Sequence, residues 1–186
     1  MKFTLSWLKD HLNTSANVNE IVDCLNKIGL EVSNLKTYKT DVKNLKVAKI
    51  IDVKKHPNSD KLKVCIIQFD EEQTQVVCGA PNVKLNKKYV FAPSGTYIGG
   101  IDLTLKKAVI RDVESNGMLC SEKELEISDD HNGIIELPDS INLNDNISNY
   151  LGIDDPIIEI EITPNRGDCL GVRGIARDLS AFGIGE

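Results

Sequence analysis

The chain lacks any apolar run that approaches the roughly 20 residues needed to cross a bilayer. Its first ten residues, Met1 to Asp10, break the apolar pattern with charges too early for a secretory signal peptide. Aromatic residues make up only 5% of the sequence, which leaves few rings on which nucleic-acid bases could stack. We therefore expect a globular cytoplasmic protein with no membrane partner.

The sequence also lacks the residue patterns of common catalytic and metal sites. It contains no glycine-rich phosphate loop ending in Gly-Lys-Ser/Thr, no Gly-x-Gly-x-x-Gly after a strand and no His-Glu-x-x-His. The five cysteines are odd in number and never form a Cys-x-x-Cys pair: Cys24, Cys65, Cys78, Cys120 and Cys169. This spacing disfavours a disulfide framework and a zinc site and favours reduced, buried thiols. We expect no catalytic residue, no metal ligand and no cofactor in the chain.

Charge is distributed unevenly along the chain, whose formal charge is −6. Residues 36–63 hold nine lysines and three aspartates, a local charge of +6, whereas residues 120–161 hold twelve acids and one lysine, a charge of −11. A basic segment attracts phosphate and an acidic one repels it. Any nucleic-acid contact is therefore predicted on the face built by residues before about Arg111; the alternative is that both segments are only solvated surface.

The first 38 residues predict helices followed by a strand. Ser6 could cap a short helix carrying Trp7 and Leu8, and Asn17 with Glu20 resembles a capping box for a second helix. Gly29 is placed to end that helix. Residues 30–35 read as a strand. This opening segment is too small to bury a core alone, so it needs a partner elsewhere in the chain.

The middle of the chain predicts successive short strands with no long helix between them, at residues 45–53, 61–69, 74–78, 89–92 and 103–113. Turns rich in glycine and proline separate them. Five such strands suit an oligonucleotide-binding (OB) type β-barrel. A different small barrel or sandwich would give the same pattern.

The end of the chain supplies the missing partner. A helical piece at 122–125, a strand at 133–137 and a polar loop at 139–149 precede an alternating strand at 157–162. Asp168 is placed to cap a helix over 169–182. The predicted fold class is α+β. A five-stranded OB-type barrel (residues 39–151) is inserted into a small, discontinuous, helix-containing domain (residues 1–38 and 152–186).

A polar turn inside the basic segment is the candidate site. Pro57 fixes a bend, and short polar side chains beside it can hold and aim a tight turn. The candidate RNA-binding residues are Lys54, Lys55, His56, Asn58, Ser59, Asp60, Lys61 and Lys63. Lysines with few aromatics favour recognition of the RNA backbone and shape over base stacking. The alternative is that the turn only joins two strands.

Several motifs resemble known families. The turn resembles the His-Pro-Asn-Ala-Asp-Lys-Leu signature of the tRNA-binding OB family, with Ser59 in place of alanine, and residues 76–83 and 115–125 resemble two further motifs of that family. Outside this region the chain resembles the N-terminus of the bacterial phenylalanyl-tRNA synthetase beta-subunit family, at residues 6–9, 29–32 and 162–179. The resemblance covers essentially the whole chain.

This resemblance implies the non-catalytic, N-terminal portion of a longer subunit. In that family the beta subunit joins an alpha subunit in an α2β2 assembly, which uses ATP and Mg²⁺ to charge tRNA(Phe) with phenylalanine at a site in the alpha subunit. The implied partners are tRNA(Phe) and the alpha subunit, with no DNA. Two alternatives stay open: an assembly or spacing module with little RNA binding, and a free-standing tRNA-binding chaperone.

Overall fold

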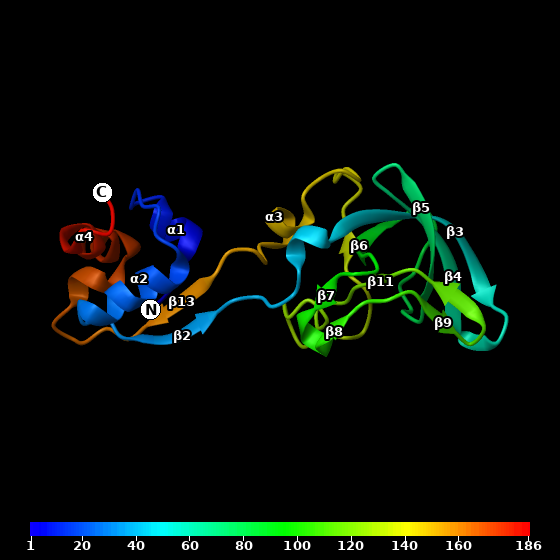
Figure 1. Cartoon of the computed structure of the whole chain (residues 1–186), viewed down its shortest axis with the longest axis horizontal. Helices are drawn as coiled ribbons and strands as arrows, with labels where there is room; N and C mark the ends of the chain where they lie inside the picture. The colour runs from blue at the N-terminus through cyan, green and yellow to red at the C-terminus, as the bar shows by residue number, and fades with distance from the viewer. The chain divides into compact units, whose positions relative to one another are not determined.

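The computed structural model describes residues 1–186, which form two compact units (Figure 1). Unit 1 comprises Met1–Thr37 together with Asp154–Glu186, and unit 2 comprises Tyr38–Ile153. The chain therefore leaves unit 1, builds unit 2 and returns to complete unit 1. All four α-helices are too short and too polar to cross a bilayer.

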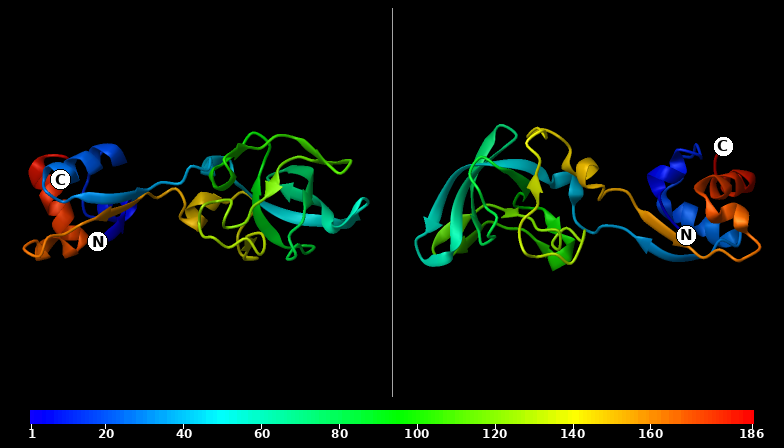
Figure 2. Two further views of the ribbon diagram at one scale, coloured as in Figure 1. Left: turned by 90° about the horizontal axis from the view of Figure 1, so that it is seen from below. Right: turned by 180° about the vertical axis from the view of Figure 1, so that it is seen from behind.

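Unit 1 is a three-stranded antiparallel sheet covered by helices. The strand order is β1-β13-β2, so the last strand of the chain lies between the first two: β1 (Lys2–Thr4), β13 (Ile157–Ile160) and β2 (Val32–Lys36). Three helices pack on this sheet (Figure 2): α1 (Leu5–Lys9), α2 (Val18–Lys27) and α4 (Val172–Phe182). The two ends of the chain thus share one core, which includes Phe3, Leu25, Ile158 and Leu179.

The helix starts of unit 1 confirm one sequence prediction and correct another. Asn17 forms the predicted capping box, because its side chain accepts from the backbone of Glu20 while its own N–H donates to the Glu20 carboxylate at 2.8 Å. The first helix, however, is capped by Thr4, whose hydroxyl accepts from the Trp7 N–H. Strand β1 runs directly into α1, so Thr4 is the residue at the junction. Ser6 instead donates to Asp155 from its backbone and its hydroxyl.

The predicted helix over 169–182 is wrong at its start. The chain forms a 3-10 helix, η3 (Gly167–Leu170), breaks at Gly171 and only then enters α4. Asp168 therefore lies inside the 3-10 helix rather than at an α-helix cap. Its carboxylate pairs with Arg166 and Arg177, so it is not available for the backbone N–H groups of α4.

Unit 2 is built on a curved antiparallel sheet of order β11-β6-β3-β4-β5, with β12 also paired to β6 (Figure 1). The strands are β3 (Lys46–His56), β4 (Ser59–Phe69), β5 (Glu72–Cys78), β6 (Lys88–Ala92), β11 (Met118–Leu119) and β12 (Glu136–Leu137). The mixed, mostly sheet architecture is confirmed. The ladder between β5 and β11 does not close, so the five-stranded OB-type barrel stays a prediction.

The remaining elements of unit 2 are short. They are the 3-10 helices η1 (Val42–Asn44) and η2 (Gly99–Ile101), the strands β7 (Tyr97–Ile98), β8 (Leu103–Thr104), β9 (Ala108–Ile110) and β10 (Val113–Ser115), and helix α3 (Ile147–Leu151). The single strand predicted over 103–113 is therefore wrong. Arg111 and Asp112 both have positive φ, +47° and +70°, and turn the chain into the β9–β10 hairpin.

Two further predictions differ from the structure. Residues 122–125 form turns rather than a helical piece. The polar loop predicted at 139–149 contains the start of α3, because the Asn146 side chain accepts from the Ser148 N–H and caps that helix. Both segments are short enough for one side-chain hydrogen bond to decide their structure.

The central strands of unit 2 are buried on both faces. Neighbouring residues of one strand point to opposite sides of a sheet. Accordingly Val47 and Val90 belong to one hydrophobic cluster, whereas Ala48 and Tyr89 belong to another. Segments after β6, including Leu125 and Ile147, cover the first face. This double burial fixes the sheet that carries the β3–β4 hairpin.

Candidate nucleic-acid interface

The polar turn predicted from the sequence is the tip of the β3–β4 hairpin, where Pro57 and Asn58 connect the two strands. His56 is almost completely buried, with 4% of its surface exposed. Its Nδ1 lies 3.1 Å from the Asn58 backbone nitrogen and its Nε2 lies 2.9 Å from the Ile110 carbonyl oxygen. Since the backbone N–H of Asn58 can only donate, Nδ1 must accept. We therefore assign the neutral tautomer in which Nε2–H donates to the Ile110 carbonyl oxygen.

Asn58 extends the same connection to the neighbouring hairpin. Its Nδ2 donates to the Arg111 carbonyl oxygen at 3.1 Å and to the Asp112 carboxylate at 3.0 Å. The Arg111 guanidinium in turn donates to the Asn58 carbonyl oxygen at 3.3 Å. His56 and Asn58 therefore hold the tip of β9–β10 against the tip of β3–β4.

The four candidate lysines differ in how strongly they are held. The Lys54 ammonium pairs with Asp52 at 2.9 Å, and the hydrogen bond from Lys54 lowers the pKa of that carboxyl group. Lys63 is half-buried and its ammonium donates to the Val83 carbonyl oxygen at 3.1 Å. Lys55 and Lys61 are exposed and form no ion pair within the chain. These two are the most available to an external phosphate.

The structure also adds a residue that sequence reasoning missed. Arg111 is exposed and lies at the polar turn because of its contacts with Asn58. Nothing in the sequence indicates this, since the two residues are 53 positions apart. We call Lys54, Lys55, Lys61 and Arg111 the basic hairpin surface. Of the other candidate residues, Ser59 is half-buried and Asp60 is exposed.

A cavity of about 450 Å³ lies next to the basic hairpin surface. All three motifs of the tRNA-binding OB family contribute to its lining, through Leu62, the segment 77–81 and the segment 118–124. Ile110, whose carbonyl oxygen accepts from His56, also lines it. The motifs that identify the family are thus brought together around one cavity.

The polar groups of this cavity form a small network. The Ser121 N–H donates to the Glu124 carboxylate, while the Ser121 hydroxyl lies 3.5 Å from both the Glu124 N–H and His131 Nδ1. Burial raises the pKa of the Cys78 thiol, which also lines the cavity. A thiol that stays protonated is a poor nucleophile.

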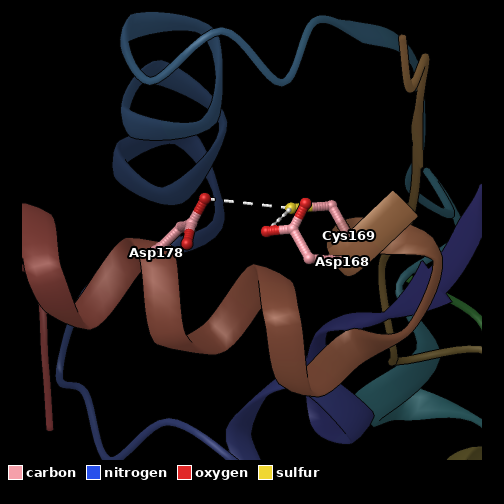
Figure 3. Close-up of side chains that lie close together, drawn as sticks. All are labelled: Asp168, Cys169 and Asp178. Atoms are coloured by element: carbon pink, nitrogen blue, oxygen red, sulfur yellow. Dashed lines mark hydrogen bonds between the residues drawn. The ribbon is translucent and has the colours of Figure 1, made fainter. Parts of the chain in front are cut away.

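Unit 1 contains one cluster with metal-ligand atoms, formed by Asp168, Cys169 and Asp178 (Figure 3). Arg166 and Arg177 pair with both carboxylates; the Arg166–Asp168 contact measures 3.1 Å and the Arg177–Asp178 contact 2.8 Å. Hydrogen bonds from Arg166 and Arg177 hold the pKa of the Asp168 carboxyl well below its usual range. A cation would have to displace two guanidinium groups, so this is a structural ion-pair network and not a metal centre.

A mostly antiparallel curved sheet with an exposed basic hairpin and a neighbouring cavity defines a candidate nucleic-acid-binding module. Residues 45–146 match the family model described as "Putative tRNA binding domain". The match covers more than half of the chain and includes both hairpins and the cavity. The chain belongs to this tRNA-binding domain family.

Known proteins resemble the chain beyond this domain. It is 50% identical over 187 residues to the phenylalanine–tRNA ligase beta subunit of Bartonella quintana (strain Toulouse), covering 100% of this chain and 23% of that protein. It is 49% identical over 193 residues to the same subunit of Cereibacter sphaeroides, and the match covers 100% of this chain and 24% of that protein. The resemblance found in the motifs is confirmed. The chain spans about a quarter of the length of the curated relatives it matches.

The similarity to solved structures is weaker. A MetRS-related protein from Pyrococcus horikoshii is 22% identical with a TM-score of 0.39, over 53% of this chain and 84% of that one. This level of similarity is too low to establish a shared fold.

Proposed function

We propose that the chain is the N-terminal, tRNA-binding part of a phenylalanyl-tRNA synthetase beta subunit and is itself non-catalytic. The chain shares about half of its residues, over its full length, with proteins that carry this name, and this similarity supports the assignment. The parent enzyme would charge tRNA(Phe) in the cytoplasm with an alpha subunit in an α2β2 assembly, using ATP and Mg²⁺. We assign neither ATP nor Mg²⁺ to this chain, because its clustered carboxylates are already paired with arginines.

The basic hairpin surface is the proposed contact with tRNA. The observation that carries this proposal is that Lys54, Lys55, Lys61 and Arg111, in a chain of charge −6, are exposed at or beside the tips of two contacting hairpins, on the domain matched by the family model. Lys55 and Lys61 would bind phosphates most strongly, since Lys54 pairs with Asp52 and Lys63 with Val83. Phosphate contacts of this kind give affinity without sequence preference.

We also infer that unit 2 is a partly open OB-type barrel. Two hydrogen bonds support closure in place of a strand ladder: the Asn116 N–H donates to the Gln75 carbonyl oxygen at 2.9 Å, and the Val77 N–H donates to the Ser115 hydroxyl at 3.1 Å. Both connect β5 with the segment that leads into β11. OB-type barrels are commonly open at one such seam and bind oligonucleotides on a strand face.

Charge reversal tests the proposed tRNA contact. The double variant Lys55→Glu/Lys61→Glu should bind labelled tRNA at least tenfold more weakly than the native chain, because two attractive phosphate contacts become repulsive. The matched control is Lys9→Glu/Lys27→Glu, which makes the same change of charge at exposed lysines of unit 1. Equal losses in both variants would mean that only net charge matters and would contradict a specific surface.

A second candidate function, an assembly module, is favoured by exposed apolar side chains on unit 1. Trp7, Leu170 and Phe182 are 47%, 69% and 49% exposed. Where such residues lie together in one patch, they are typical of protein interfaces. The assembly function predicts that Leu170→Ser weakens binding of the chain to the rest of the synthetase and leaves tRNA affinity unchanged.

A further inference from the structure

The cavity beside the basic hairpin surface has the size and position of a ligand site. Its volume of about 450 Å³ falls within the range of roughly 300–1,000 Å³ typical of small-molecule sites. Two of its lining residues are sequence neighbours of basic ones: Leu62 follows Lys61, and Ile110 precedes Arg111. The backbone that carries the basic hairpin surface therefore borders the cavity.

The lining of the cavity suits a flat, partly polar ring. Leu62, Ile110 and Met118 provide aliphatic walls, and the Met118 thioether is polarisable and packs well on aromatic faces. Glu124, Ser121 and His131 provide the polar groups. The Glu124 carboxylate accepts a hydrogen bond from the Ser121 N–H on Oε2, and a carboxylate has about four acceptor positions. Glu124 therefore has capacity to accept hydrogen bonds from a ligand.

We propose that this cavity binds one unpaired nucleobase, with guanine preferred, and that Glu124 determines this specificity. Guanine presents two adjacent donors, N1–H and the 2-amino group, which match a carboxylate in a bidentate pair. Adenine and cytosine present an amino donor beside an acceptor, and uracil a single N–H between two carbonyl oxygens. The attached phosphate would lie on the side of the cavity that is bordered by Leu62 and Ile110.

This inference deepens the proposed tRNA binding and rests on it for the source of the base. A guanine could come from an unpaired nucleotide of tRNA, where bases are accessible for such readout, or from a free nucleotide. The chemistry recognised by the cavity is the same for both. The basic hairpin surface would supply affinity through phosphates, and the cavity would supply base preference.

The test compares the pentanucleotides UUGUU and UUUUU on the full chain. The native chain should bind UUGUU about tenfold more tightly, the discrimination expected of one bidentate base contact. Glu124→Gln should abolish this preference, because the amide can still accept from Ser121 but offers a donor to N1–H; its UUUUU binding should change only as much as in the charge-matched control. The control Asp129→Asn removes the same charge from an exposed position nearby and should keep the preference. Thermal melting verifies that each variant is folded.

The outcomes separate this inference from the proposed function. Equal binding of UUGUU and UUUUU, or a preference that survives Glu124→Gln, overturns the cavity proposal, even if tRNA binding still depends on Lys55 and Lys61. Binding of GMP that is lost in Glu124→Gln, in a chain that does not bind tRNA, supports the cavity and contradicts the proposed tRNA function. Competition between GMP and tRNA, with both weakened by Glu124→Gln, supports the two together.

Discussion

The imidazole of His56 connects two hairpins that are distant in sequence, through Asn58 in one and Ile110 in the other. His56→Ala should lower the free energy of unfolding of unit 2 by about 1–3 kcal/mol, because it leaves buried backbone groups without partners. Chemical denaturation followed by circular dichroism measures this loss. Lys55→Ala, at the exposed neighbouring position, should change stability by less than about 0.5 kcal/mol. Unchanged stability in His56→Ala would mean that the imidazole does not support the turn.

Gly117 occupies a backbone conformation that no other residue fits. Its φ is +118°, and an added Cβ would lie 2.5 Å from the Ala92 carbonyl oxygen and 2.6 Å from the Phe91 ring. Gly117→Ala should therefore lower the free energy of unfolding by about 2–5 kcal/mol, because backbone strain and overpacking add together. Gly95→Ala is the matched control: its φ is +99° but the space around it is open. Gly95→Ala should lower the free energy of unfolding by only about 1–2 kcal/mol, because it introduces backbone strain alone. Equal losses of stability would contradict the steric account.

At the level of elements, the ion-pair network of Arg166, Asp168, Arg177 and Asp178 attaches the turn before α4 to that helix. The pKa of Asp168 is held below its usual range mainly by Arg166. A depressed carboxyl pKa contributes stability above the pKa of the unfolded chain, about 3.9, and this contribution is lost as the pH falls through the folded pKa. Unit 1 should therefore lose stability as the pH falls below about 4.

The fluorescence of Trp7, the only tryptophan, reports on unit 1 and measures this loss in melts at several pH values. In Arg166→Gln the acid dependence should be shallower, since the main cause of the Asp168 shift is removed. Arg173→Gln removes a charge from an exposed arginine of α4 that forms no ion pair, and it should keep the native pH dependence. A native-like acid profile in Arg166→Gln would show that the network does not set it.

Local signals in the sequence predicted the elements that depend on local interactions. The capping box at Asn17 and the long strands β3, β4 and β5 follow from patterns within a few residues. Other elements differ where competing partners of a side chain, or its backbone conformation, decide the structure. Asp168 is a poor helix cap because Arg166 and Arg177, the latter inside α4, pair with its carboxylate. The β9–β10 hairpin depends on positive φ at Arg111 and Asp112, which neither residue type signals strongly.

The candidate site shows the same limit. The sequence located the polar turn and its lysines, but it could not show that His56 and Asn58 face another hairpin, because the residues they contact follow more than 50 positions later. The cavity was not predicted at all. Its lining comes from five separated segments of unit 2, and only the folded sheet brings them together. The family motifs mark these segments individually without revealing what they surround.

At the level of the whole molecule, the chain combines an acidic body with one basic surface on a tRNA-binding domain. The uneven charge makes the proposed binding to RNA a local property of unit 2 rather than of net charge. We propose that the basic hairpin surface contacts tRNA phosphates. A chain that neutralises phosphates releases counterions, so its affinity must fall as salt rises.

The most direct measurement is the slope of log affinity against log salt concentration for the native chain and for Lys55→Glu/Lys61→Glu. We predict a clearly negative slope for the native chain. Loss of two phosphate contacts should make the slope of the double variant shallower by roughly 1.4–1.8. The control Lys9→Glu/Lys27→Glu should keep the native slope. A native affinity that does not change with salt, or a double variant whose slope equals that of the native chain, would contradict a phosphate contact at this surface.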